Sequence, residues 1–479
     1  MVAASALMRT GGRVDAPAAA QDPRLGLLLA SGGDDRIWLD PVTRRNRYGA
    51  PGKPAPDELW FSSSTASPVS PRGWAAAGEA LGQLVEGRSL TIGGWFDSLR
   101  RRLLALYGAP GAEAVLAASG TEAELVVLGL ALSLAEGPLV NIVVAPAETG
   151  SGVPAAASGQ HFLGRASLGA EVTKGGRLAG WDDADVTLET VEIREPGGAL
   201  RAQSDVDQEA AERVGRAVAG GAFALLHVLD ASKTGRPGVS RAAAAEILAR
   251  HSGRVLVVVD ACQLRCPPRA IRDDLAQGFA VMVTGSKFAG GPAFCGALLL
   301  PAAMTERLAA RPPCGAPLAP YSAALDWPAR LRPAGLAHVA NLGLGLRWSA
   351  ALAEIEAFEA TPAARRAAVL DQFERSVRGR VAADPGLELI DHGLRPEAPG
   401  LVPVFHADRC DPRPAYEALA RGDGGGLPCH LGQPVMIGRR AALRVCASMP
   451  MITGAVRHGC AEVEAGLDQL FESWARLRG

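Results

Sequence analysis

The sequence predicts an α/β protein in which a mostly parallel sheet lies between helices, followed by a smaller α+β C-terminal domain. Three observations lead to this fold class: short apolar runs, helical stretches that alternate with them, and a proline-rich break after which the rhythm changes. Continuous apolar runs suit strands that are buried on both faces, as in a parallel sheet covered by helices. Strands and helices in alternation are typical of doubly wound folds.

The expected elements follow the chain in order. Strands are expected at residues 139–145, 223–229, 255–260, 280–285 and 295–301, and helices at 205–220 and 240–253. After the proline-rich stretch at 311–333 we expect long helices over about 338–380, strands near 387–391 and 400–405, and a glycine-rich loop at 422–426. The chain therefore divides into an N-terminal segment (1–85) that wraps onto the core, a large domain (86–330) and a small C-terminal domain (331–479).

Composition excludes several classes of function. Lys plus Arg (49) nearly cancels Asp plus Glu (50), which gives no general electrostatic reason to bind nucleic acid or an anionic membrane. No apolar run is long enough to span a bilayer, and charged residues interrupt the first 22 or so residues, so these resemble a flexible leader and not a signal peptide.

Cysteine usage indicates a reducing compartment. The eight cysteines form no recognisable disulfide framework, and the one close pair, Cys262 and Cys266, lacks partners at zinc-site spacing. We therefore expect a cytoplasmic protein without a metal site.

The residues that carry chemistry follow two of the expected strands. Asp260 ends the apolar run 255–260, and Lys287 follows the run 280–285 and precedes a Gly-Gly-Pro turn. The carboxyl ends of parallel strands are where such sheets present ligands, so an acid and a lysine there can hold a planar cofactor from two directions. A lysine after a strand is usually a solvated loop residue, but its pairing with Asp260 and the glycine-rich turn favour a catalytic one.

A possible anion site lies upstream. Ser119, Gly120 and Thr121 lead from a strand into a helix, and a glycine-containing turn there offers free backbone N–H groups and the positive end of the helix dipole. Taken alone, such a turn is more often a plain N-cap.

With these motifs in this order, the sequence resembles the pyridoxal-phosphate (PLP) enzymes of fold type I. It is similar in particular to the class V aminotransferase and cysteine desulfurase group, which has selenocysteine lyase and kynureninase as relatives. The resemblance lies in Asp260-x-x-Gln263 and in Lys287 with its Gly-Gly-Pro turn, and it covers roughly residues 85–450. It implies PLP as cofactor, a seven-stranded-type sheet in the large domain, and a homodimer.

The resemblance also implies roles for individual residues. Lys287 would hold PLP as a Schiff base, and Asp260 would keep the pyridine nitrogen protonated, which makes the ring an electron sink. Gln263 would bind the ring hydroxyl. Contacts to the phosphate would come from Ser119, Gly120, Thr121 and Thr284.

Several positions depart from the pattern of the group or leave alternatives open. Ser286 stands where a histidine commonly precedes the lysine. Thr149 stands where a histidine stacks on the ring and is itself a candidate cofactor contact, and Glu148 matches the neighbour of that histidine. For Glu148, a loop residue and a catalytic one are equally good interpretations. Asp230 would reach the ring hydroxyl or the substrate, whereas His227 is more simply a core residue.

The C-terminal segment resembles that of the desulfurase and selenocysteine lyase branch. Arg444 falls where that branch binds the substrate carboxylate, which a guanidinium can grip with two hydrogen bonds, although an arginine in a strand can also be an edge-strand surface residue. Leu431 occupies the position of the persulfide-forming cysteine, and Cys429 lies two residues earlier, beyond His430. By default a nucleophile so displaced does not reach the substrate.

The first functional hypothesis is an enzyme that forms an external aldimine with an L-amino acid or amine-bearing metabolite and performs aminotransferase-like chemistry through a Cα carbanion. C–S or C–Se lyase chemistry is the second, and replacement at Cβ or Cγ and epimerisation stay open. A third hypothesis, a binding protein without turnover, is disfavoured by the complete set of lysine, acid, phosphate turn and arginine. The expected partners are a small amino-acid-type substrate and a second copy of the chain.

In the N-terminal segment, Arg47, Tyr48 and residues 62–65 could border the pocket, but a low-complexity loop is the safer interpretation.

Overall fold

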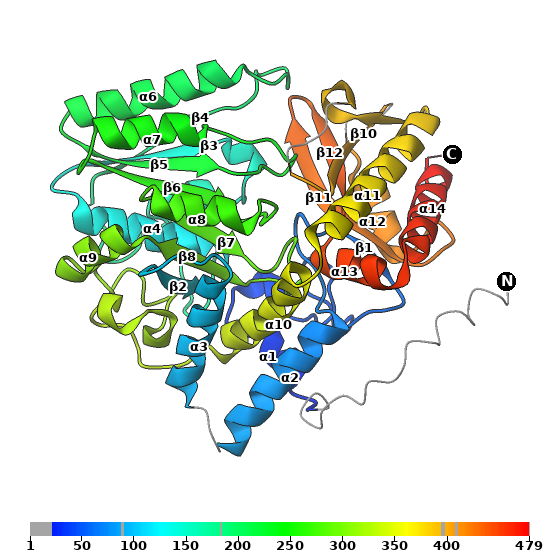
Figure 1. The fold of residues 1–479 in the computed structure, drawn as a ribbon, viewed down its shortest axis with the longest axis horizontal. Helices are drawn as coiled ribbons and strands as arrows, with labels where there is room; N and C mark the ends of the chain where they lie inside the picture. Colours follow the sequence, from blue (N-terminus) through cyan, green and yellow to red (C-terminus); the bar gives the residue numbers. More distant parts are fainter. Residues whose placement is uncertain (1–21, 88–90, 183, 394–397, 408–410, 479) are drawn as a thin grey trace.

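The computed structural model describes residues 22–87, 91–182, 184–393, 398–407 and 411–478, which build two sheets and the helices around them (Figure 1). The larger sheet has seven strands in the order β2-β8-β7-β6-β5-β3-β4. They are β2 (Glu113–Ala117), β3 (Leu139–Val144), β4 (Val186–Val191), β5 (Phe223–Leu229), β6 (Val255–Ala261), β7 (Ala280–Thr284) and β8 (Gly296–Leu300). The predicted fold class, a mostly parallel seven-stranded sheet between helices with a smaller α+β part, is confirmed.

Strand directions bring the sequence motifs to one edge. Neighbouring pairs from β7 through β6, β5 and β3 to β4 are parallel, and β8 runs antiparallel to both β7 and β2. The carboxyl ends of β2, β3, β5, β6 and β7 therefore meet at the same edge of the sheet. Ligands bind at this edge in open α/β sheets.

Helices cover both faces of the large sheet, which explains the continuous apolar runs. Along β6, Val257 and Val259 pack into the core that contains α6 (Gln203–Ala219), α7 (Arg241–Arg250) and α8 (Pro268–Ala276). Leu256 and Val258 pack on the other face, against α4 (Gly120–Leu134) and α9 (Ala302–Ala310). Since successive side chains of a strand point to opposite faces, both alternate sets must be apolar.

The smaller sheet is built mainly from the C-terminal part of the chain. Its order is β1-β11-β12-β10-β9, with β9 (Leu387–Leu389), β10 (Leu401–His406), β11 (Cys429–Ile437) and β12 (Arg440–Cys446). The helices after α9 are α10 (Leu342–Glu359), α11 (Ala363–Ala383), α12 (Arg413–Arg421), α13 (Met449–His458) and α14 (Ala461–Arg476). The remaining helices are α1 (Leu25–Leu29), α2 (Pro71–Glu86), α3 (Ile92–Ala105) and α5 (Val153–Ala157).

An N-terminal strand completes the smaller sheet. β1 (Leu59–Phe61) pairs in parallel with β11, so that Leu59 lies opposite Cys429, and Figure 1 shows it among the C-terminal strands. A further bridge joins Ser62 to Cys446, and Ser67 forms a bridge to Pro292 beyond the large sheet. The N-terminal segment thus connects the two sheets close to the cleft described below.

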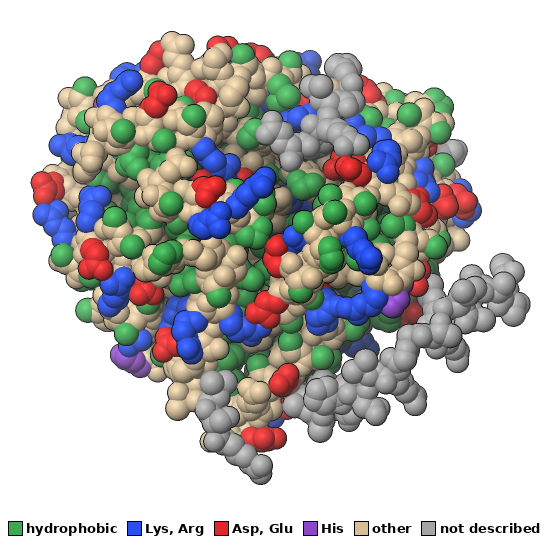
Figure 2. Space-filling view, in the orientation of Figure 1, with side chains coloured by type: hydrophobic (Ala, Val, Ile, Leu, Met, Phe, Trp, Pro, Cys, Tyr) green, Lys and Arg blue, Asp and Glu red, His purple; other side chains and the backbone are tan. Residues whose placement is uncertain are grey.

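The surface agrees with the balanced composition. Acidic and basic side chains are interspersed on the face shown in Figure 2, without a large field of one sign. Within the part of the chain that the structure describes, none of the helices combines the length and the apolar character needed to cross a bilayer.

Candidate active site

A cleft opens at the edge where the large-sheet strands end. Its free space, including the open mouth, is about 1020 Å³. The predicted site residues that line it are Ser119, Gly120, Thr121, Thr149, Asp260, Gln263, Thr284 and Lys287. Asp230 and Arg444 are not among the lining residues.

Lys287 sits on a turn that is closed by backbone hydrogen bonds. The Gly290 N–H donates to the Lys287 carbonyl over 2.9 Å, and the Gly291 N–H donates to the Gly285 carbonyl over 2.8 Å. Gly290 has φ +76°, and a Cβ there would lie 2.4 Å from Cδ of Pro450. Glycine is therefore required at position 290 for both reasons, and the turn holds the lysine in a fixed place.

Asp260 and Gln263 stand at the end of β6. The Cys262 backbone N–H donates to Oδ1 of Asp260 over 3.0 Å, which fixes the carboxylate. The Gln263 amide donates from Nε2 to the Ser64 carbonyl over 3.2 Å, whereas its buried Oε1 has no hydrogen-bond partner. Leu264 follows with φ +54°, an unfavourable conformation for a non-glycine residue, and such residues cluster at functional sites. An unpartnered buried acceptor is suited to a hydroxyl donor of a ligand.

The Ser-Gly-Thr turn begins α4. Oγ of Ser119 accepts from the Glu122 N–H over 3.2 Å and so caps the helix. A Cβ at Gly120 would lie 2.8 Å from Sγ of Cys262, so the close approach of the two loops requires glycine. Since the turn lines the cleft, the N-terminus of this 15-residue helix is available to an anion.

Two residues with hydroxyl groups, Thr284 at the end of β7 and Ser286 just beyond it, also line the cleft. Oγ1 of Thr284 donates to the Cys262 carbonyl over 2.6 Å, so in this conformation the hydroxyl cannot also donate to a phosphate. Ser286, which replaces the expected histidine, also lines the cleft.

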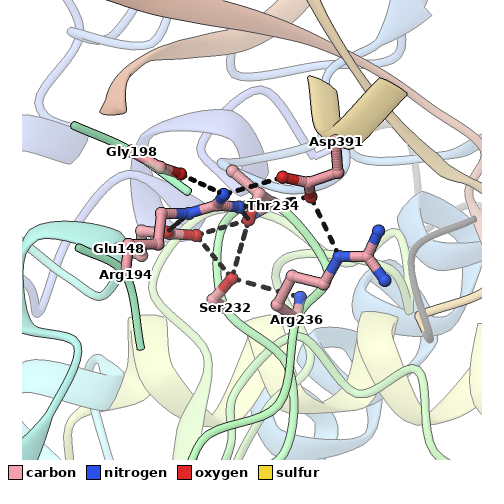
Figure 3. A network of polar contacts seen from close by, with 7 residues as sticks. All are labelled: Glu148, Arg194, Gly198, Ser232, Thr234, Arg236 and Asp391. Carbon is pink, nitrogen blue, oxygen red and sulfur yellow. Dashed lines mark hydrogen bonds and ion pairs between the residues drawn. The ribbon is translucent and has the colours of Figure 1, made fainter. Parts of the chain in front are cut away.

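Glu148 is held in a network of polar contacts (Figure 3). It accepts hydrogen bonds from Nε of Arg194 over 2.6 Å, from the Ser232 hydroxyl over 2.7 Å and from the Thr234 hydroxyl. Arg194 also pairs with Asp391 over 2.8 Å. Because Glu148 is 4% exposed and occupied by these partners, it joins the loops after β3 and β5 and is not a free acid or base.

Thr149 lines the cleft but cannot replace a stacking histidine. Its Oγ1 donates to the Pro146 carbonyl over 3.2 Å. The aromatic rings among the described lining residues are Tyr48 and Phe294, whose centroids lie 6.2 Å apart. Phe294 has φ +68°, a further unfavourable backbone conformation beside the cleft.

Neither Asp230 nor Arg444 lines the cleft, but Arg444 contacts residues that do. Asp230 forms an ion pair with Arg241 over 2.8 Å, outside the cleft lining. Arg444 is buried directly behind lining residues: its Nε donates to the Gln433 carbonyl over 3.1 Å and its Nη2 to Oγ1 of Thr65 over 2.9 Å. No carboxylate of the described chain forms an ion pair with Arg444, and burial lowers the pKa of its guanidinium.

Two charged residues of the cleft were not expected from the sequence. Arg36 lies 4.8 Å from the Phe294 ring centre and donates to Asp34 from Nε over 2.9 Å. Lys233 lines the cleft from the loop after β5, three residues beyond Asp230. Burial, followed by the charges of Arg444 and Lys287, lowers the pKa of Lys233 to about 7. The sequence signal that could have pointed to Lys233 is its place on the loop after the apolar run 223–229, which also carries Asp230.

The cysteine near the desulfurase position lies outside the cleft lining. Cys429 belongs to β11 and is buried, its thiol donates to the Leu427 carbonyl over 3.3 Å, and burial raises its pKa to about 11. Leu431 is buried as well. His430 stacks on Trp60 and bonds to Glu58 over 2.6 Å.

No protein-family profile and no curated protein matches this sequence. Solved structures do match it. The cysteine desulfurase CsdA from Escherichia coli is 14% identical with a TM-score of 0.56, and the match covers 88% of this chain and 95% of that one. A phosphoserine aminotransferase from Cytophaga hutchinsonii is 13% identical with a TM-score of 0.54, over 86% and 99% of the two chains.

A third structure contains the cofactor. It is a mutant of C-DES with glycine covalently linked to PLP, 14% identical with a TM-score of 0.56, over 85% of this chain and 97% of that one. The chain has the fold-type-I fold of PLP enzymes.

The cleft residues fit the cofactor of fold-type-I enzymes. The Lys287 amine can form an imine with an aldehyde, and the Asp260 carboxylate can accept a proton or an N–H donor. The N-terminus of α4 can hold a phosphate. Gln263 lines the same cleft, and its unpartnered Oε1 offers an acceptor to a ring hydroxyl.

Proposed function

We propose that this chain is a PLP-dependent enzyme that acts on the amino group of an L-amino acid or amine-bearing metabolite with aminotransferase-like chemistry. The supporting observation is that Lys287, Asp260, Gln263 with its unpartnered Oε1, and the N-terminus of α4 line one cleft. PLP, when bound there, supplies an aldehyde for the substrate amine and a ring that withdraws electrons from Cα.

The chain's own residues divide the remaining tasks. Asp260 holds the proton on the ring nitrogen, and its carboxylate is fixed for this purpose by the Cys262 N–H. The Lys287 amine removes and returns the proton at Cα, since a lysine amine beside the reacting carbon is a suitable general acid and base. The turn at Ser119–Thr121 binds the phosphate, with Thr284 beside it.

Arg444 is proposed to bind the substrate α-carboxylate. Its guanidinium lies behind Thr65 and Gln433 and is without an ion-pair partner among the described residues. A buried unpaired cation carries a free-energy cost that an incoming carboxylate offsets. Asp230 and Thr149 are not part of this mechanism, because the first is paired with Arg241 and the second bonds to the backbone.

Aminotransferase-like chemistry is preferred to C–S lyase chemistry because none of the described cysteines is placed and ionised as the nucleophile that a desulfurase requires. The thiolate is the nucleophilic form of cysteine. Cys429 is buried in β11 and its raised pKa, about 11, keeps it protonated at neutral pH. The thiol that does line the cleft, Cys262, also has its pKa raised by burial.

The test distinguishes the two lysines of the cleft. Protein loaded with PLP is expected to be yellow, and borohydride is expected to fix a phosphopyridoxyl group on Lys287, located by peptide mass spectrometry. Lys287→Ala should lose the reducible imine, whereas the exposed Lys174→Met serves as the matched control and should retain it. A label on Lys233, or an imine that persists in Lys287→Ala, would refute the assignment.

The same preparation tests the reaction class. Incubation with a panel of L-amino acids should give keto acids, detected by mass spectrometry, and little sulfide from L-cysteine. Absence of any spectral change with every amine would instead support a protein that binds PLP without turnover.

We further propose that the protein is a homodimer in a reducing cytoplasm. We also propose that the chain divides into an N-terminal segment (1–85), a large domain (86–330) and a small C-terminal domain (331–479). Every cysteine that the structure describes is unpaired, which is compatible with a reducing compartment. Sedimentation equilibrium of the purified protein, with about twice the 49.4 kDa chain mass expected, tests the dimer.

A further inference from the structure

One charge in the cleft has no use in the mechanism above. The charged residues of the lining are Arg36, Glu148, Lys233, Asp260 and Lys287. Arg36 is paired with Asp34, and Glu148 is paired with Arg194. The cofactor engages Lys287 and Asp260 in the proposed function. Of these five residues, Lys233 is the one with neither a carboxylate partner in the described part of the chain nor a task in the proposed function.

The backbone around Lys233 is fixed. Its N–H donates to the Glu148 carbonyl over 2.8 Å. The side chains on either side of it, Ser232 and Thr234, both donate to the Glu148 carboxylate, as Figure 3 shows. The network therefore holds the loop from both sides and leaves the lysine between them facing the cleft. A loop whose backbone is already fixed costs little further backbone entropy when one of its side chains binds a ligand.

The surroundings of Lys233 are electropositive. Arg444 and Lys287 are the nearby cations, and both lower the pKa of its amine. The one opposing charge, that of Glu148, is already neutralised by Arg194. The half-buried Lys233, which lines the cleft, and the buried Arg444, which lies behind its lining, thus both lack a carboxylate partner in the described part of the chain, which is the electrostatic pattern of a site for an anionic ligand.

Lysine is also rare in this chain. Only four of the 49 Lys and Arg residues are lysines, namely Lys53, Lys174, Lys233 and Lys287. Lys53 and Lys174 are exposed, whereas the other two line the cleft. An ammonium is a compact point charge on a thin stem, so it can reach a ligand where a guanidinium does not fit.

We propose that Lys233 binds a second acidic group of the substrate, so that the substrate is an amino acid with an anionic side chain. This inference rests on the proposed function, in which Arg444 takes the α-carboxylate. Lys233 then determines substrate specificity. It forms a charge-assisted hydrogen bond with the anionic side chain of the substrate, whereas a neutral substrate side chain would leave the positive potential of the cleft uncompensated.

The test uses PLP-loaded protein and two carboxylates that lack an amine and therefore bind without turnover. Calorimetric titration is expected to show succinate binding about tenfold more tightly than propionate, the contribution typical of one hydrogen bond between charged groups. Lys233→Met should abolish this difference, and Lys174→Met should preserve it.

The pH dependence gives a second readout. The charged groups that face Lys233 are Arg444 on β12, Lys287 after β7 and Glu148 after β3. The ammonium exists below the pKa of Lys233, so succinate affinity is expected to fall as the pH rises through that pKa, from about pH 6 to about pH 9. Propionate affinity should change less over this pH range. In Lys233→Met, the affinities for succinate and for propionate should depend on pH in the same way.

Three outcomes would overturn the inference. Equal affinity for succinate and propionate in protein that carries the Lys287 imine would show that no second cation acts on the ligand. An unchanged ratio in Lys233→Met would show that the cation is another residue. A Lys233→Met protein that loses affinity for PLP but keeps the ratio would place Lys233 on the cofactor phosphate. A protein that takes up no PLP at Lys287 would instead refute the proposed function.

Discussion

The network around Glu148 permits a double-mutant test of how the loops of the cleft are held. Arg194 lies between two carboxylates, with 2.6 Å to Glu148 and 2.8 Å to Asp391, and its side chain is 8% exposed. Glu148→Gln and Asp391→Asn each remove one of these charges, and the second carboxylate then still neutralises the guanidinium. The double variant leaves the charge of the buried Arg194 without either carboxylate to neutralise it.

The magnitudes follow from this geometry. Each single substitution should lower the free energy of unfolding by about 1.5–3 kcal/mol, the usual contribution of a hydrogen bond to a charged group. Leaving a buried charge without compensation adds a further cost. The double variant is therefore expected to lose at least about 1 kcal/mol more than the sum of the two single losses.

Urea unfolding followed by tryptophan fluorescence measures these differences. Glu195→Gln is the matched control, because Glu195 is 61% exposed and lies 4.0 Å from its nearest arginine, so its effect should stay within about 0.5 kcal/mol. Additive losses, within about 0.5 kcal/mol, would show that the two carboxylates do not share Arg194 and would refute the reasoning.

Two further predictions concern the substrate and the thiol. Arg444→Ala is expected to weaken amino-acid binding to the PLP-loaded protein by about 2–5 kcal/mol, and Arg444→Lys should recover little, because lysine cannot make the bidentate contact. If titrations of Arg444→Ala with amino acids, followed by absorbance, match those of the unaltered protein, another cation binds the substrate carboxylate. Cys429→Ser should leave turnover nearly intact. Iodoacetamide at about pH 8 should label the exposed Cys314 and spare Cys429, whose pKa is about 11, and a cysteine-dependent persulfide on Cys429 would contradict both expectations.

The large sheet was predictable because burial on both faces leaves a local signal. Strands β3, β5, β6 and β7 appear in the sequence as apolar runs, and their positions matched. β4 (Val186–Val191) was missed because it is an edge strand with a half-exposed, polar-interrupted sequence. β1 was missed because three residues carry little periodicity, and its pairing depends on β11, far along the chain.

The candidate site was predictable where strand ends determine position. Asp260 and Lys287 lie at neighbouring strand ends, so topology alone brings them together. The direction of a loop side chain depends on tertiary contacts that the sequence does not display. Asp230 is therefore bound by Arg241 outside the cleft, and Lys233, three residues later, lines it. The roles of these residues and the boundaries at 85 and 330 stay predictions.

The pairing of β1 with β11 has a consequence for how the protein acquires its site during synthesis. Leu59 and Cys429 are about 370 residues apart, so the strand that leads into Ser64 and Thr65 of the cleft cannot dock until the chain has left the ribosome as far as β11. Closing a loop of this length postpones that contact relative to local ones. The seven-stranded sheet, whose residues all precede position 301, can form earlier. We therefore expect the nascent chain to carry Asp260 and Lys287 on a folded sheet while one wall of the cleft is still missing.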